Sequence, residues 1–482
     1  MGISAATAAS NESLDPGRWR SLGVVLAAAF LVGLDFFVVN VSIPSIRADL
    51  HASFAEVQLV IASYGLTYAV LLISGGRLGD IYGRKRMFLW GVAGFTLTSA
   101  LCGLAPTPRF LILGRALQGM AGALLFPQVL SVIQVTFPVR ERAKAFGLFG
   151  TIIGTASFSG NVLGGLLVSA NVFGLSWRPI FLINLPIGLI TILAATRTIR
   201  ESRSPKARRL DLGGVALMTG SLGLLLYPLV EGREAGWPLW TYACLAGAIL
   251  LLFLFVRYEQ GVTQRGGSPL VELSLFQDRA FVIGLLSGVC FFSGAAAFFL
   301  ISTIFLQNGL GFSARAAGLT FSSFAVAFLG SSLMSVRVQP KLGSRIINLG
   351  AALMMVGLAA LLWMARSRGS ALTGLELAPV LMTYGMGQGF VMPTLISTVL
   401  INIKGHDAGS ASGVLTTVQQ VSFAMGVAVI GTVFFSVLGN RTSVESFVSA
   451  LCTAFSVNIF LLAATFLLIL QIPRNPVKDM PR

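Results

Sequence analysis

Residues 75–89 read GGRLGDIYGRKRMFL, and they join two long apolar runs at 57–79 and 87–105. The junction combines regularly spaced glycines, one acid and three consecutive basic residues. A loop that only holds positive charge on one side of a membrane needs the basic residues, but not the full spacing G-x-L-x-D-x-x-G-R-K-R. We therefore expect two membrane-spanning helices joined by a short, specifically built loop.

Each residue type in this junction has a physical task. Gly76 and Gly79 allow close helix approach, and Gly83 permits a tight turn. Asp80 is expected near the positive N-terminal end of the helix that follows it. Arg84 begins the basic run that anchors the loop. We take Gly76, Asp80, Gly83 and Arg84 as a candidate conformational motif.

The composition of the whole chain extends this prediction. Of the 482 residues, 55% are hydrophobic and only 11% are charged, and the mean hydropathy is +0.84. A soluble domain carries roughly a quarter charged residues. Apolar runs recur along nearly the whole length, so we expect an all-α polytopic membrane protein. We expect 14 spans, near 21–43, 57–79, 87–105, 110–136, 145–169, 179–196, 212–230, 239–256, 280–306, 316–336, 346–364, 376–403, 411–437 and 450–472.

The distribution of Lys and Arg predicts the orientation. The net charge is +16, but the basic residues gather in alternate loops, which favours membrane topology over nucleic-acid binding. Of the 34 Lys and Arg residues, 25 lie on the side of the N-terminus, eight lie on the opposite side, and Arg115 lies inside a span. We expect both termini in the cytoplasm and the chain in the inner (cytoplasmic) membrane of the cell.

Two loops divide the chain. Residues 197–211 (RTIRESRSPKARRLD) are strongly basic, and 257–279 form the longest loop. They bracket two spans between two sets of six, and internal repeats of this kind are a known device in membrane transport proteins. The predicted organisation is a cytoplasmic tail at 1–20, a six-helix half at 21–196, a region at 197–279 with the basic loop, two inserted helices and a central loop, a second six-helix half at 280–472, and a cytoplasmic tail at 473–482.

Asp35 is an acid inside the apolar run 24–41 (VVLAAAFLVGLDFFVVNV), with no basic residue nearby in sequence. A bare carboxylate in hydrocarbon costs several kcal/mol, so it is kept only when it is paired, protonated or facing water. Arg115 is the second embedded charge. It lies about 8 Å from the outer end of its helix, against about 14 Å for Asp35, so their side chains can meet. We expect contact; a static ion pair that fixes helix packing is the alternative to a relay role.

Several segments together resemble one family. The junction at 75–89 is similar to the signature loop of the major facilitator superfamily. LDFFVVNVSIP at 34–44 and RALQG at 115–119 look like motifs of its 14-span drug:proton antiporter branch, and WRPIFLINLPIG at 177–188 and LDLG at 210–213 are similar to segments that flank the inserted pair in that branch. The resemblance covers essentially the whole chain. It implies the major facilitator fold, with two six-helix halves and two inserted helices.

At a buried carboxylate such as Asp35, a proton and a positively charged group become alternative partners. Near Arg115, Asp35 would stay ionised; a cationic substrate could compete for it, and a proton could release that substrate. The resemblance implies that Arg115 takes part in proton coupling. Asp35 and Arg115 are therefore the candidate proton-coupling residues.

Small residues also recur in the run 145–169. Gly150, Gly154, Gly160 and Gly164 favour tight helix contacts and complete the candidate conformational motif. The run is similar to the antiporter motif G-x-x-x-G-P-x-x-G-G, but Asn161 stands where that motif has proline. Because proline kinks a helix and asparagine does not, we expect close packing without the family's kink.

No other chemistry is expected. A GxxxxGK[ST] loop is absent, and neither the two histidines nor the four cysteines have metal-ligand spacing. We therefore expect no enzyme activity, no cofactor and no metal. We assign the polar residues Asn40 and Gln118 to a substrate pathway, against the alternative that such amides only bond across helices.

The leading hypothesis is a proton-coupled antiporter that exports hydrophobic or cationic small molecules, such as drugs, toxins or natural products, by alternating access. A solute:proton symporter of the same fold is the alternative. A receptor or a lipid-modifying enzyme is disfavoured, because there is no catalytic constellation and no sizeable soluble domain. The expected partners are the small-molecule substrate, protons and the lipid bilayer, with the chain as a monomer.

Overall fold

The structure is a computed structural model that describes residues 16–52, 54–204, 211–232, 235–267, 269–400, 403–404, 407–439 and 441–472. Over these residues the chain is helical and contains no strand. The first half consists of α1 (Arg18–Asp49), α2 (Phe54–Tyr82), α3 (Arg84–Gly103), α4 (Pro108–Thr136), α5 (Val139–Ala170), the 3-10 turn η1 (Val172–Gly174), α6 (Pro179–Leu182) and α7 (Asn184–Thr198).

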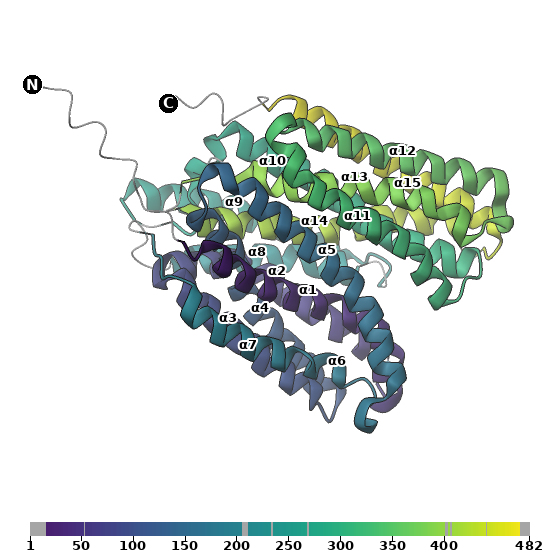
Figure 1. Ribbon diagram of the computed structural model, residues 1–482, viewed down its shortest axis with the longest axis horizontal. Helices are drawn as coiled ribbons and strands as arrows, with labels where there is room; N and C mark the ends of the chain where they lie inside the picture. Colours follow the sequence, from purple (N-terminus) through teal and green to yellow (C-terminus); the bar gives the residue numbers. More distant parts are fainter. Residues whose placement is uncertain are drawn as a thin grey trace, which may run out of the picture.

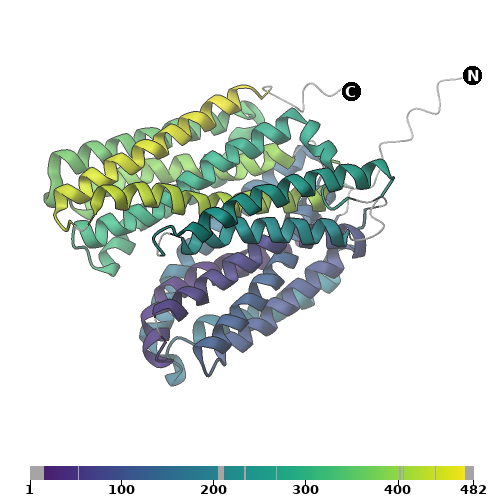
Figure 2. The ribbon, with the colours of Figure 1, turned by 180° about the vertical axis from the view of Figure 1, so that it is seen from behind.

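Two helices and a short turn connect this half to the second one. They are α8 (Leu212–Glu231), α9 (Leu239–Gln264) and η2 (Leu273–Gln277). The second half consists of α10 (Arg279–Ile304), the π turn η3 (Phe305–Gly309), α11 (Ala314–Leu342), α12 (Arg345–Arg368), η4 (Gly369–Ala371), α13 (Gly374–Leu400), α14 (Ala408–Leu438) and α15 (Val444–Leu470). Figure 2 shows α8 and α9 as a teal pair between the two halves.

Each of the 14 predicted ranges overlaps a helix, and eleven segments of the described chain are long and apolar enough to cross a membrane. The helices α3, α5 and α13 are not among these segments; in α13, small and polar residues such as Gly385, Gly387, Gln388 and Gly389 lower the hydropathy. The all-helical, multi-span fold is confirmed. The count of 14 spans stays a prediction.

The span predicted at 179–196 is found as the apolar segment Pro179–Thr198, which is long enough to cross a membrane. The segment breaks at Ile183, between α6 and α7. Pro186 explains the break, because it has no backbone N–H and its ring clashes with the carbonyl four residues earlier. The break places Asn184 at the first turn of α7.

The two halves contact each other near one end of the molecule. Gly76 of α2 lies backbone to backbone against Gly409 of α14, and the Gln134 side chain of α4 donates to the carbonyls of Leu400 and Ile403. These contacts adjoin the basic loops. From there the helices of the two halves diverge toward the opposite end (Figures 1 and 2). The structure is therefore closed at the end that carries the basic loops.

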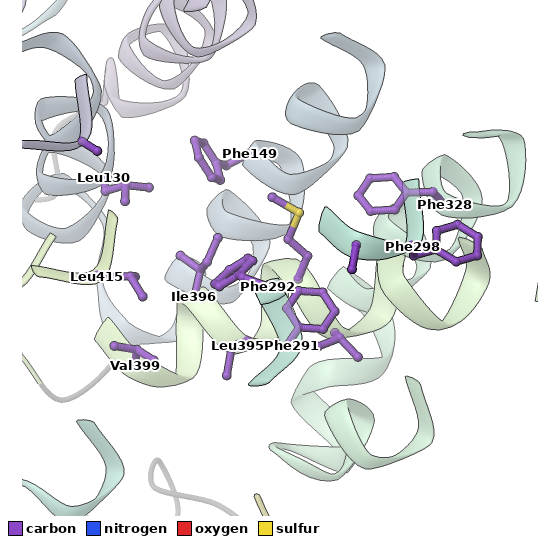
Figure 3. Packing of buried hydrophobic residues seen from close by; sticks show 14 of the residues in the cluster. Leu130, Phe149, Phe291, Phe292, Phe298, Phe328, Leu395, Ile396, Val399 and Leu415 are labelled. Carbon is purple, nitrogen blue, oxygen red and sulfur yellow. The ribbon is translucent and has the colours of Figure 1, made fainter. Parts of the chain in front are cut away.

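One hydrophobic cluster runs through this junction. It includes Leu130 and Phe149 from the first half and Ile396, Val399 and Leu415 from the second, all of which are nearly or fully buried. Figure 3 shows these side chains facing one another between the halves. Apolar burial thus holds the two halves together at the closed end.

Candidate functional site

Asp35 lies within the first half, on the face of α1 that packs against α4 and α7. Its side chain is fully buried, with 0% exposed, whereas the next residue, Phe36, is 38% exposed. Figure 1 shows α1 beside α5, and α1 also packs against α4 and α7. In this conformation the carboxylate is therefore closed off from bulk solvent.

Three donors surround the Asp35 carboxylate. Arg115 Nη1 lies 2.6 Å from Oδ2, which confirms the predicted contact. Gln118 Nε2 and Asn184 Nδ2 donate to Oδ1 at 2.9 and 2.8 Å. A buried charge of this kind is tolerable only when it is both paired and hydrogen-bonded, and here it is both.

A serine fixes the two amides in place. Ser99 Oγ of α3 accepts from Asn184 Nδ2 at 2.8 Å and from Gln118 Nε2 at 3.2 Å. The same hydroxyl donates to the Phe181 carbonyl at 2.9 Å, so its hydrogen points away from both amides. Four helices of the first half therefore meet in one polar network around Asp35.

Arg115 is held on every side. Its Nη1 also donates to Gln118 Oε1 at 2.7 Å, and its Nε donates to the Val60 carbonyl at 3.4 Å. The guanidinium carbon lies 4.2 Å from the centroid of the Tyr64 ring, which is a cation–π contact. This arrangement uses the planar shape of the guanidinium, which lysine does not offer.

Sequence reasoning did not find Ser99, Tyr64 or Asn184. A signal existed for Asn184, because it stands in the segment 177–188, just before a proline in an otherwise apolar run. Gln118 was assigned to a substrate pathway, and the structure places it inside this buried network, with 0% exposed. The side chain of Asn40 lies outside the described residues.

The candidate motif at the α2–α3 junction joins the two halves. Asp80 and Arg84 form a buried ion pair at 2.6 Å. The Asp80 carboxylate also accepts from the backbone N–H groups of Gly409 at 3.2 Å and Ser410 at 3.1 Å, at the start of α14. A carboxylate is favoured there, because the N-terminus of a helix carries free N–H groups and partial positive charge.

The expected partner of Asp80 is therefore corrected. We predicted the N-terminal end of the next helix, α3, but those N–H groups are taken by Glu201. The Glu201 carboxylate accepts from the backbone N–H of Lys85 and of Arg86, each at 3.1 Å. Glu201 comes from the basic loop after α7, and its approach depends on a long-range turn of the chain that the local spacing does not reveal.

The glycines of the junction allow these contacts. Gly83 has φ 107°, which confirms the predicted tight turn, and a Cβ atom there would collide with Glu201. A Cβ atom on Gly76 would collide with the carbonyl oxygen of Gly409 in α14. Only glycine lets α2 and α14 approach this closely.

The glycines of α5 face two different partners. Gly150 packs against Pro393 of α13, and Gly154 packs against the Phe328 ring of α11. Gly160 and Gly164, farther along, pack against α1 beside Leu34 and Val38. The helix is unbroken from Val139 to Ala170, as expected without a proline at position 161. The helix α5 therefore links the Asp35 helix to the second half.

The comparisons with known proteins agree with this architecture. Residues 25–427 match the family model described as Major Facilitator Superfamily. The chain is 42% identical over 427 residues to a probable actinorhodin transporter of Streptomyces coelicolor, covering 88% of this chain and 74% of that protein. It is 35% identical over 429 residues to a puromycin resistance protein of Streptomyces alboniger, covering 88% and 83%. It is 32% identical over 408 residues to a multidrug resistance protein of Mycobacterium tuberculosis, covering 84% and 73%.

Two solved structures show the same fold at low sequence identity. The human organic anion transporter MFSD10 aligns with a TM-score of 0.66 and 16% identity, over 94% of this chain and 100% of that one. The proton:xylose symporter XylE aligns with a TM-score of 0.61 and 15% identity, over 92% and 94%. This chain therefore belongs to the Major Facilitator Superfamily and is a multi-pass membrane transporter rather than an enzyme.

Proposed function

We propose that this chain is a proton-coupled antiporter with 14 spans, which exports hydrophobic or cationic small molecules across the cytoplasmic membrane by alternating access. In this proposal both termini are cytoplasmic and the chain works as a monomer. The supporting observation is the buried Asp35–Arg115 pair, since an ionisable residue inside a span is by default part of a pathway or relay.

Proton binding at Asp35 would change the forces between helices. The carboxylate accepts hydrogen bonds from three donors, an arrangement that favours its ionised form. A proton on Oδ1 or Oδ2 would remove the charge that holds Arg115 and would take one of the acceptor positions. The contact between α1 and the helices α4 and α7 would weaken.

That change has a direct route to the second half. The helix α1 packs on Gly160 and Gly164 of α5, and α5 packs through Gly150 and Gly154 on α13 and α11. A shift of α1 therefore acts on the helix that contacts both halves. We assign the conformational motif (Gly76, Asp80, Gly83 and Arg84, with the four α5 glycines) to the closing of the basic-loop end.

The names of the relatives support export as the direction and natural products or drugs as the substrates. They include a cephamycin export protein and a tetracenomycin C resistance and export protein, besides the transporters above. A symporter would use the same ion pair in the same fold. The direction of substrate movement relative to protons distinguishes the two.

Inverted membrane vesicles with an acidified interior provide the test, with ethidium as a hydrophobic cationic probe. An antiporter accumulates ethidium while protons leave; a symporter expels it. We expect Asp35→Asn to lose proton-driven accumulation by tenfold or more, on the order of 1.4 kcal/mol of lost coupling. Unchanged accumulation would remove Asp35 from the mechanism.

Asp49→Asn is the matched control, because it removes an acid from the same helix outside the network. Asp49 pairs with Arg178 at 2.6 Å. Burial raises the pKa of Asp49, but the hydrogen bonds from Arg178 and Trp177 outweigh it, so the pKa lies below its ordinary value and the group stays charged at neutral pH. We expect this variant to keep full proton-driven accumulation.

A further inference from the structure

The helices α8 and α9 carry a second pair of acids that the proposed export mechanism does not use. Glu259 lies near the end of α9 that meets the central loop, and its side chain is 0% exposed. Asp211 precedes α8 and caps its N-terminus by accepting from Gly214 N–H at 3.0 Å. No salt bridge reaches either acid within the described part of the chain.

Two carboxyl oxygens face each other without a donor. Asp211 Oδ2 and Glu259 Oε1 are both buried and have no hydrogen-bond partner. Both lie beside Gly214, where an added Cβ would be 2.9 Å from Asp211 Oδ2 and would collide with Glu259 Oε1. The two side chains are within hydrogen-bonding reach of each other. The other oxygens are occupied, because Tyr258 Oη donates to Asp211 Oδ1 at 2.9 Å and Val271 N–H donates to Glu259 Oε2 at 3.1 Å.

A single proton satisfies this arrangement. Two ionised carboxylates at this distance repel each other in a buried site, and each would leave one oxygen without a donor. A proton shared between Asp211 Oδ2 and Glu259 Oε1 replaces the repulsion with one O–H···O hydrogen bond. We propose that Asp211 and Glu259 form a second proton-binding site, separate from Asp35, which holds one shared proton.

Within the described residues, few charged groups lie near this pair. The described charged and titratable groups near this end of the packed elements are Arg257, Tyr258 and Arg265 on α9, Glu272 in the central loop, Arg77 and Asp80 at the end of α2, and Asp407 before α14. Of these, Tyr258 hydrogen-bonds to the pair, through Asp211. The site therefore consists of two carboxyl groups, one of which accepts a hydrogen bond from a phenol. A proton is the ligand that its acceptor oxygens require.

The site also touches the closed end of the transporter. Glu259 holds the backbone of Val271, and the neighbouring Leu270 is fully buried. The Leu270 carbonyl accepts from Ser410 Oγ at 3.5 Å, and the Ser410 N–H binds Asp80. Loss of the shared proton would push Glu259 from Asp211 and loosen the central loop. Proton binding at this pair therefore stabilises the closed basic-loop end.

Infrared spectra of the purified protein test whether the pair holds a proton. The spectra are recorded over roughly pH 5 to 9, above the range in which isolated Asp and Glu titrate. We expect the carbonyl band of one protonated carboxylic acid in the wild type. Both Glu259→Gln and Asp211→Asn should abolish it; asparagine also preserves the N-cap of α8. Glu231→Gln, at the other end of α8, is the matched control and should leave the band. A band that survives in both site variants, or its absence from the wild type, overturns the proposal.

Trypsin cleavage at the exposed Arg265 tests whether the shared proton stabilises the central loop at the closed end. In the wild type we expect cleavage to accelerate over the pH range in which the carbonyl band disappears. The rate should rise by no more than tenfold per pH unit, which is the limit when a single proton is released. Glu259→Gln, whose amide can donate to Asp211, should keep the slow rate throughout; a pH response equal to that of wild type contradicts the proposal. Both measurements use the resting protein without substrate, so a failure of proton-driven export does not affect them. If one variant does not fold, the other still reports.

Discussion

In the two six-helix halves, helices at corresponding positions build cores with different chemistry. In the first half, the first, fourth and sixth helices bring together Asp35, Arg115 and Asn184. In the second half, the helices in the same order bring together Phe298, Tyr384 and Asn458: the Phe298 and Tyr384 rings stack with centroids 3.8 Å apart, and Asn458 Nδ2 donates to the Gly294 carbonyl at 2.9 Å. One core is charged and the other is aromatic.

This difference locates the response to protons. The six predicted spans of the second half contain no charged residue apart from Glu376 at the start of one of them. The stacked aromatic core contains no carboxylate, whereas the core of the first half is built around the carboxylate of Asp35. We infer that the second half is a fixed partner and that the first half changes its packing when a proton binds.

Removal of Arg115 should have the largest effect. Arg115→Leu leaves Asp35 buried and unpaired, which typically destabilises a protein by about 3–5 kcal/mol. We expect a large fall in the thermal unfolding temperature in detergent, together with loss of proton-driven accumulation. The double variant with Asp35→Asn should recover part of the stability, because no unpaired charge remains. Equal stability of the single variant and wild type would contradict the ionised pair.

Disruption of the contact between the two halves should have the second-largest effect. Gly76→Leu places a side chain against the Gly409 carbonyl, and overpacking of this kind costs about 1–3 kcal/mol. We expect the basic-loop end to open, so that a cysteine introduced by Ala408→Cys, at a site with 0% exposure, reacts faster with an impermeant maleimide in inverted vesicles. Gly65→Leu is the control, because that position of α2 faces open space. The same labelling rate in both backgrounds would break the argument for α2–α14 closure.

The aromatic core should respond least. The buried Tyr384 hydroxyl makes no hydrogen bond of normal geometry, so Tyr384→Phe should change the free energy of unfolding by no more than about 1 kcal/mol. Proton-driven accumulation and its pH profile should match those of wild type. A changed pH profile would mean that both halves respond to protons, and the contrast between them would fail.

Local sequence predicted much of the fold. Apolar runs and their charged boundaries locate the helices, since a span must bury about 20 residues in lipid whatever its neighbours are. The Asp35–Arg115 contact was also predictable, because two opposite embedded charges at similar depth have strong reason to meet. Proline at position 186 marked a weak span, but the structure was needed to show the break at Ile183.

The finer contacts were not predictable, because they depend on how helices rotate and pack. Ser99 and Asn184 reach Asp35 only when α3 and α7 present particular faces to α1. Asp80 was paired with the wrong helix, since the helix that begins at residue 408 is more than 300 residues away in the chain. Nothing in the spacing of residues 211 and 259 indicates that their carboxyl groups meet.

Amino-acid composition and order were sufficient for the membrane fold, the embedded charges Asp35 and Arg115, and the family, because these follow from hydropathy and short motifs within single segments. Tertiary structure decided which donors complete the Asp35 network, which helix end Asp80 caps, and that Glu259 faces Asp211. The physical reason is that hydrogen bonds require atoms within about 3 Å in a set direction. In a bundle of long helices, only packing determines that geometry.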